Sequence, residues 1–203
     1  MQLLFQTSST TIASNERGEH SAQSLSARTG MNPTRSKRHV FWLTLIAWLS
    51  MLGFDFFLHA GLLAGLYLQP SPFLLPPLTA FTLIPVGYLS FLLSAVLLVW
   101  LMIRLRLSGW RQGARFGLEL GGLTWGAFAL GLLSVSTASF ALLVGWFIGQ
   151  TLELAIAGAV VGSGLAGMRL RRLFGVVIVF VLLSVITTII LQSLGVVPTT
   201  RLS

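Results

Sequence analysis

Residues 140–168 form a long apolar stretch with one acidic residue inside it. They read FALLVGWFIGQTLELAIAGAVVGSGLAGM, and Glu153 lies near the middle. About 20 helical residues cross the roughly 30 Å hydrocarbon core of a bilayer, so this stretch is long enough to span it. A continuous apolar run lacks the alternation of barrel strands, which favours a helix. The sequence therefore predicts a transmembrane helix that carries a carboxyl group within the membrane.

Four further apolar runs predict five membrane-spanning helices in all. They cover about residues 40–66, 78–103, 114–135 and 173–196. The chain is 55% hydrophobic and 9% charged, whereas soluble domains carry about 25% charged residues, and this excludes a soluble enzyme. We expect an all-α integral membrane bundle with a four-helix core, whose third and fourth helices form the packed centre, and a peripheral fifth helix. Pro85 is expected to kink the second helix near its outer end.

Polar segments flank this transmembrane domain, which covers residues 39–196. Residues 1–38 show no apolar period and cannot bury enough surface to fold, so they predict a disordered cytoplasmic tail. Residues 197–203 are expected to form a short external tail. We hypothesise that translation in the cell starts at Met31, because a short basic lead-in to the first helix follows it directly.

The basic residues predict the orientation of the chain. Ten of them lie before the first helix, between the second and third, and between the fourth and fifth, whereas the loops 69–77 and 136–139 carry no charge. The positive-inside rule then places the N-terminus in the cytoplasm and the C-terminus outside. The net charge of +8 is explained by arginines next to anionic lipid headgroups, and no nucleic-acid partner is expected.

Three of the five acidic residues lie within predicted helices: Asp55, Glu119 and Glu153. A charged residue at the bilayer centre costs about 2.5–3.5 kcal/mol on insertion scales, so these side chains should face protein, water or one another. Asp55 and His59 are four residues apart and share one helix face. We expect Asp55, His59 and Glu153 to meet in one buried cluster, with Gln150 and Glu119 at its edge. In that cluster Glu153 is expected to be protonated beside an Asp55–His59 pair.

Small residues predict where the helices approach closely. Several glycines lie on the same face as Glu153, so a neighbouring helix can come near at the level of the acid. Other glycines recur at intervals of four. The candidates for helix packing are Gly117 and Gly121 in the third helix, and Gly145, Gly149, Gly158 and Gly162 in the fourth.

Two segments resemble a family of small, uncharacterised bacterial membrane proteins with four spans. Residues 54–67, FDFFLHAGLLAGLY, are similar to the first helix of that family, with its Asp-x-x-x-His and an outer aromatic residue. Residues 145–158, GWFIGQTLELAIAG, look like its last helix. The resemblance covers about residues 40–168 and implies a four-helix unit of the bacterial plasma (inner) membrane with no assigned activity.

Three interpretations of the polar cluster remain open. The first is a non-enzymatic membrane protein of unknown role, in which the cluster holds helices together. The second is a small proton-coupled carrier or ion-conducting protein, working as a homo-oligomer or in a membrane complex. The third is a metal-dependent intramembrane enzyme with Asp, His and Glu ligands. We expect the first, with no catalytic residue, no cofactor and no resident metal; the chain also has no cysteine for thiolate chemistry.

Overall fold

The structure is a computed structural model that describes residues 36–69 and 71–198. The hypothesised start at Met31, nearly all of the expected N-terminal tail and residues 199–203 lie outside the described residues. The chain divides into two units, residues 1–37 and 38–203. The description below concerns the second unit.

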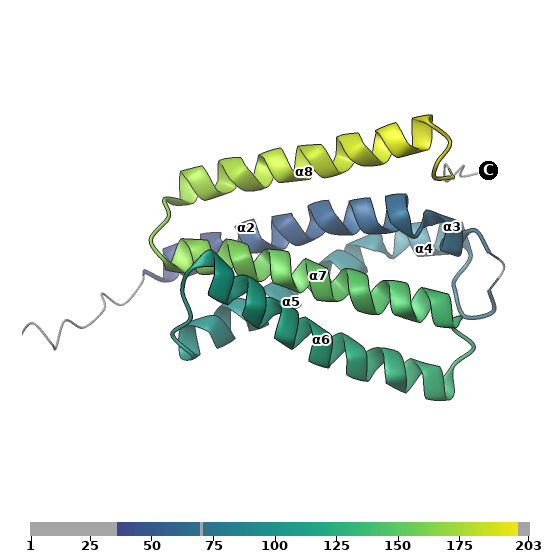
Figure 1. Cartoon of the computed structure of the whole chain (residues 1–203), viewed down its shortest axis with the longest axis horizontal. Coiled ribbons are helices and arrows are strands. Elements are labelled where there is room, and N and C mark those ends of the chain that lie inside the picture. The colour runs from purple at the N-terminus through teal and green to yellow at the C-terminus, as the bar shows by residue number, and fades with distance from the viewer. Residues whose placement is uncertain (1–35, 70, 199–203) are drawn as a thin grey trace, which may run out of the picture. The chain divides into compact units, whose positions relative to one another are not determined.

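The described residues form helices and contain no strand. The long helices are α2 (Lys37–Phe56), which continues as the π-helix η1 (Phe57–Leu62), α5 (Ile84–Arg104), α6 (Trp110–Val135), α7 (Phe140–Leu165) and α8 (Leu170–Ser193) (Figure 1). Two short helices are α3 (Ala64–Tyr67) and α4 (Pro77–Thr82). The five long segments are each long and apolar enough to cross a membrane. The prediction of an all-α chain with five such helices is therefore confirmed.

The second predicted helix is broken rather than kinked. Leu83 separates α4 from α5, and Pro85 lies in the first turn of α5. Proline has no N–H to donate and fits the first turn, where that donor would have no helical partner, but it cannot continue a helix from the preceding turn. Pro85 therefore starts a new helix.

Helix α7 is the centre of the bundle and uses two faces for packing. One face meets α2 and the segment that follows it: Leu43, Leu58 and Leu63 contact Gly164, Gly149 and Gly145. The other face meets α6 and the residue before it, where Gly158 and Gly162 lie against the backbone of Gly113 and Gly109. Gly117 and Gly121 of α6 face Leu154 and Thr151 of α7. All six glycines predicted to pack helices therefore do so.

Helix α6 approaches α7 by direct backbone contact, and we call this contact the glycine seam. A Cβ atom added at Gly113 would lie 2.0 Å from the carbonyl oxygen of Gly158. The helices move apart further along α6. A Cβ atom added at Gly121 would lie 2.9 Å from its nearest neighbour, and one added at Gly126 would lie 3.4 Å from its nearest neighbour. The buried residues of α6 are the seam glycines Gly113, Gly117 and Gly121. The third and fourth helices thus form the closest pair, but α6 lies at the edge of the bundle.

Helix α8 packs along α2 and η1 through a polar stripe. Val181 lies against Gly53, and the buried Thr188 lies beside Gly61. Gln192 Nε2 donates to the carbonyl oxygen of Ala60, 2.9 Å away. The buried share of α8 equals that of α5 and exceeds that of α6. By burial, α6 is therefore the outlying helix more than α8 is.

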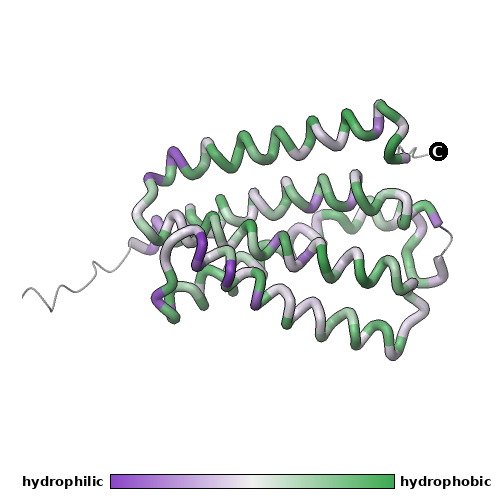
Figure 2. The backbone as a smooth tube through the Cα atoms, viewed as in Figure 1, coloured by the Kyte–Doolittle hydropathy of each residue, from purple (hydrophilic) through white to green (hydrophobic). Residues whose placement is uncertain are grey.

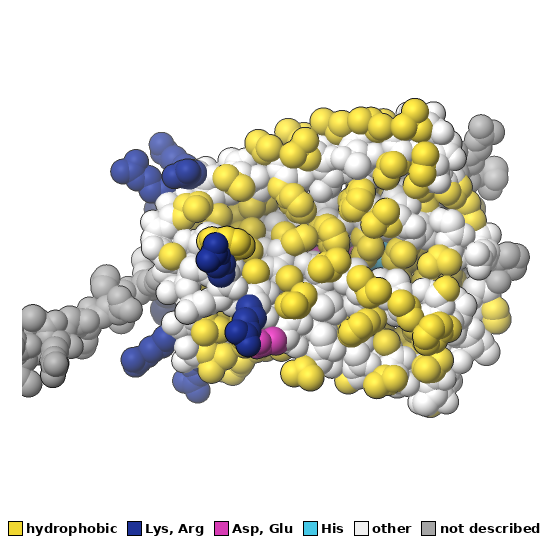
Figure 3. All heavy atoms as spheres, viewed as in Figure 1, with side chains coloured by type: hydrophobic (Ala, Val, Ile, Leu, Met, Phe, Trp, Pro, Cys, Tyr) yellow, Lys and Arg dark blue, Asp and Glu magenta, His cyan; other side chains and the backbone are white. Residues whose placement is uncertain are grey.

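Charge is concentrated at one end of the second unit. Hydrophilic residues gather where α2 and α6 begin and α5 and α7 end, and the basic side chains project from that end (Figures 2 and 3). They are Arg38, Arg104, Arg106, Arg111, Arg115, Arg169, Arg171 and Arg172. The loops at the opposite end carry no charged residue within the described ranges. We call these the basic end and the uncharged end.

Candidate functional site

The packing of α2 against α7 brings Asp55 level with Glu153. The two helices run antiparallel, with Leu43 against Gly164 near the basic end and Leu58 against Gly149 further along. Interpolating between these two contacts sets residue 55 opposite residue 152, one position from Glu153. The two acids that were expected to share a cluster therefore lie at a similar level.

Asp55 and His59 are in direct contact where α2 passes into η1. His59 Nε2 lies 3.1 Å from Asp55 Oδ1, and the two side chains are 28% and 13% exposed. His59 belongs to the π-helix, a form of helix that is rare and is often found at functional sites. The contact predicted from the four-residue spacing is therefore present, and it lies within an unusual turn.

A directed chain of hydrogen bonds extends from this pair toward the uncharged end. Trp146 Nε1 donates to the hydroxyl oxygen of Tyr67, and that hydroxyl also contacts His59 Nδ1, each at 2.5 Å. Tryptophan can only donate, so the Tyr67 oxygen accepts from it. The Asp55 carboxylate can only accept, so in the neutral His59 ring the proton lies on Nε2 and is donated to Asp55. Nδ1 is then the acceptor of the ring, and the Tyr67 O–H donates to it. We call the series Trp146, Tyr67, His59, Asp55 the donor chain.

Tyr67 keeps its proton in this arrangement. Burial raises the pKa of the Tyr67 phenol above its usual value, the hydrogen bond from Trp146 opposes this in part, and the charge of Asp55 raises the pKa further. The protonated phenol is the form that donates to His59. The environment of Tyr67 therefore favours the direction assigned to the donor chain.

Glu153 is fully buried, and neither of its carboxyl oxygens has a hydrogen-bond partner among the described residues. The buried amide of Gln150 approaches the Glu153 carboxyl without the geometry of a full hydrogen bond, and the charge of Asp55 acts on the same carboxyl. More than about 90% of buried polar groups in native proteins are hydrogen-bonded. Leaving a carboxyl unpaired in this way costs its full desolvation energy. Glu153 is the least satisfied polar group of the site.

Glu119 does not belong to the cluster, so that prediction is wrong. Its side chain is 56% exposed and its Oε1 accepts from Arg115 Nε, 2.9 Å away on the same helix. The glycine seam decides this outcome, because Gly117 faces α7 and Glu119 follows two residues later, about 200° around the helix. Glu119 therefore faces away from the bundle and pairs with Arg115 near the basic end.

The described residues do not bring together a metal-binding donor set. No three His, Asp or Glu side chains in this part of the chain come close enough to hold one ion. Asp55 and His59 use their facing atoms on each other. The arrangement can transfer a proton along bonded atoms, but within these ranges it offers no three-ligand centre.

Sequence reasoning missed Tyr67, Trp146 and Gln192 as members of the site. In the sequence, Tyr67 stood out only as the outer aromatic residue of the segment 54–67. Trp146 meets it from 79 positions away, and no local period signals such a contact. Gln192 did carry a signal, since it follows Ser184 and Thr188 at intervals of four on one face of α8.

No family model matches the chain, and neither a curated protein nor a solved structure is significantly similar to it.

Proposed function

We propose that this chain is a non-enzymatic, multi-pass protein of the bacterial plasma membrane that transfers protons between the donor chain and Glu153. Five apolar helices and the concentration of arginines at one end support the membrane location. The family resemblance of residues 54–67 and 145–158 supports the bacterial one. The proton function rests on the geometry of the site.

The observation that carries the proposal is the unpaired, fully buried Glu153. A carboxyl that joined helices structurally would bond to a partner, and Glu153 bonds to none among the described residues. Ionisable groups inside a membrane are costly and generally mark functional sites. A buried carboxyl that is not held by a cation or a well-formed hydrogen bond is costly to leave charged, so it is suited to binding a proton. Glu153 is accordingly the proposed proton-binding group.

The donor chain supplies a route to the level of Glu153. When Tyr67 gives its proton to His59 Nδ1, His59 can release the proton on Nε2 to Asp55, and Tyr67 takes a new proton from solvent at the uncharged end. The net result is one proton moved from that end to Asp55, which is then neutral, while His59 carries its proton on Nδ1 and returns to its first tautomer before the next transfer. Asp55 lies level with Glu153 but no hydrogen bond reaches the Glu153 oxygens among the described residues, so the last step to Glu153 requires one of the two side chains to move.

Proton flux into liposomes tests the proposal. Purified protein is reconstituted with a pH-sensitive dye inside the vesicles, and a pH step is applied outside. We expect Glu153→Gln and Asp55→Asn to remove most of the protein-dependent flux, because an amide cannot bind and release a proton. Glu119→Gln is the matched control: it makes the same change in an exposed carboxyl outside the site and should preserve the flux.

A structural role is the second candidate, and two interhelical bonds favour it. Trp146 of α7 bonds to Tyr67, and Gln192 of α8 bonds to the backbone of Ala60. If the cluster only holds helices together, Glu153→Gln should change the thermal stability in detergent and wild-type protein should carry no flux. Flux that survives Glu153→Gln at wild-type level would contradict the proton proposal.

A further inference from the structure

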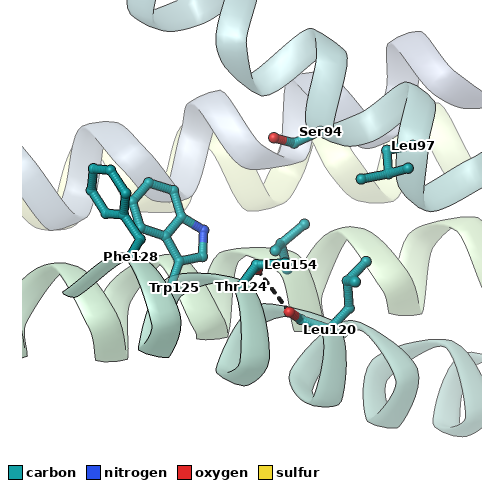
Figure 4. A pocket seen from close by; sticks show the side chains of 7 residues that line it. All are labelled: Ser94, Leu97, Leu120, Thr124, Trp125, Phe128 and Leu154. Carbon is teal, nitrogen blue, oxygen red and sulfur yellow. Dashed lines mark hydrogen bonds between the residues drawn. The ribbon is translucent and has the colours of Figure 1, made fainter. Parts of the chain in front are cut away.

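A groove lies between α5 and α6 on the outer side of α7. Its volume is about 240 Å³, and its lining consists of Ser94 and Leu97 from α5, Leu120, Thr124, Trp125 and Phe128 from α6, and Leu154 from α7 (Figure 4). The segment between α5 and α6 covers only residues 105–109. Such a short connection usually joins helices that pack together, but here each packs on α7 and leaves the space between them.

The groove opens into the hydrocarbon region. Leu97 and Phe128 are 44% and 48% exposed beside it, and its hydroxyls already donate to their own helices, Ser94 to Ser90 and Thr124 to Leu120. Trp125 and Phe128 stack edge to face at one side. Pockets for drug-sized ligands measure about 300–1,000 Å³, so this groove is suited to a segment of an apolar chain that enters from the bilayer.

Arginines without an acidic partner lie at the basic end of the same two helices. Arg104 and Arg111 stack on Trp100 and Trp110, with 5.8 and 5.2 Å from the guanidinium carbon to the ring centroid. Arg106 lies between them in the connection. No carboxylate pairs with these three among the described residues, whereas Arg115 pairs with Glu119. The positive charge at this end of the groove is therefore not neutralised by a carboxylate of the described residues, and an anion from outside the chain can pair with it.

The separation of charge and groove matches the dimensions of a lipid. Leu97 and Ser94 lie seven and ten residues before Arg104, and Leu120 lies nine residues beyond Arg111, which is about 11, 15 and 14 Å along the helix axes. One leaflet of the hydrocarbon core is about 15 Å thick. A headgroup phosphate beside these arginines would thus place the end of its acyl chain in the nearer part of the groove.

From this complementarity we propose that the groove between α5 and α6 binds an acyl chain of an anionic phospholipid, whose phosphate is held by Arg104, Arg106 and Arg111. The proposal is independent of the proton function, because neither the donor chain nor Glu153 lines the groove. It also differs from general attraction to the membrane surface, since it assigns one lipid to one pair of helices.

Quenching of Trp125 by brominated lipids tests the site. The purified protein in mild detergent is titrated with phosphatidylglycerol or phosphatidylcholine brominated at mid-chain, and the Trp125 signal is the difference between wild type and Trp125→Phe. We expect phosphatidylglycerol to quench at a lower concentration than phosphatidylcholine. Replacing Arg104, Arg106 and Arg111 by Gln should raise the required concentration about fivefold for each arginine removed.

Matched variants distinguish this site from nonspecific attraction between arginines and anionic lipid. Replacing Arg169, Arg171 and Arg172 by Gln removes the same charge at the connection between α7 and α8 and should leave the quenching unchanged. Ser94→Phe fills the groove and should abolish the quenching. The proposal is overturned if phosphatidylglycerol and phosphatidylcholine quench Trp125 at the same concentration, or if replacing either arginine triplet has the same effect on the quenching. It is also overturned if glycerol phosphate binds to the protein while Ser94→Phe leaves the quenching by phosphatidylglycerol intact, because the arginines would then bind a phosphate without an acyl chain in the groove.

Discussion

Tyr67 is the residue that links two helices of the site. Its hydroxyl oxygen accepts from Trp146 of α7 while its proton goes to His59 of η1. Loss of either hydrogen bond leaves a buried donor or acceptor without a partner, which lowers the stability by about 1–3 kcal/mol. The state of this one phenol therefore determines whether the donor chain is continuous.

The raised pKa of Tyr67 gives a pH prediction. The chain has two tyrosines, so Tyr88→Phe leaves Tyr67 as the sole phenol. An unfolded tyrosine ionises near pH 10, whereas folded Tyr67 retains its proton above that pH. The unfolded state then binds fewer protons, so the stability from this group is complete below about pH 10 and falls as pH rises further. Tyrosinate absorbance, followed in mild detergent and in denaturant, checks this expectation.

Two outcomes of that titration are informative. Folded protein should develop tyrosinate absorbance at higher pH than denatured protein of the same variant. Coincident titration curves in the two states would show that the phenol is not buried against Trp146 and His59.

For single residues, the sequence predicts which side chains of one helix are partners better than it predicts which face of that helix meets the rest of the bundle. Asp55 and His59 were expected to pair because their spacing alone brings them together. Glu119 was misplaced because its direction depends on which face of α6 meets α7. Gly113 and Gly117 decide that face by contacts across the bundle, and their spacing in the sequence did not show that Glu119 lies opposite.

Among the helices, α6 and α7 have the closest contact and the least tolerance for added atoms. We expect Gly113→Ala to destabilise the protein by about 1–3 kcal/mol, as overpacking generally does, because the new Cβ would meet the Gly158 carbonyl. Unfolding in mild detergent, by heat and by added dodecyl sulfate, measures the change.

Gly122→Ala is the matched control for that prediction. It makes the same substitution in the same helix, at a position with open space around it. Since alanine favours a helix interior by up to about 1 kcal/mol over glycine, its stability should equal or exceed that of wild type. An equal loss in both variants would contradict a specific seam at Gly113.

The elements themselves could be predicted from the sequence to a large extent. Long apolar runs define the five helices because a bilayer leaves few alternatives for the backbone. The break at Leu83 and the π-helix after Phe56 were not predicted. The break comes from Pro85, which was expected only to kink the helix, and the π-helix lies where Gln192 of α8 bonds to the backbone of Ala60.

For the molecule as a whole, charge predicts an orientation. The basic end should face the cytoplasm and the uncharged end the outside. The natural absence of cysteine permits single-cysteine labelling without further changes. We expect Thr137→Cys, in the loop between α6 and α7, to react with a membrane-impermeant maleimide on intact spheroplasts.

Ser108→Cys provides the comparison from the basic end. It lies in the exposed connection between α5 and α6 and should react only after the membrane is permeabilised. Labelling of Ser108→Cys and protection of Thr137→Cys in intact spheroplasts would reverse the orientation.

The glycine seam also bears on how the protein assembles during synthesis. Only residues 136–139 connect α6 to α7, and backbone-to-backbone contact requires no ordering of long side chains, so this hairpin can close as soon as both helices have entered the bilayer. Helix α2 emerges earlier, but its contacts with α7 and α8 form only when those helices have been made. Helix α8 is made after α7 and closes over η1, so the polar site is completed only when α8 has been inserted.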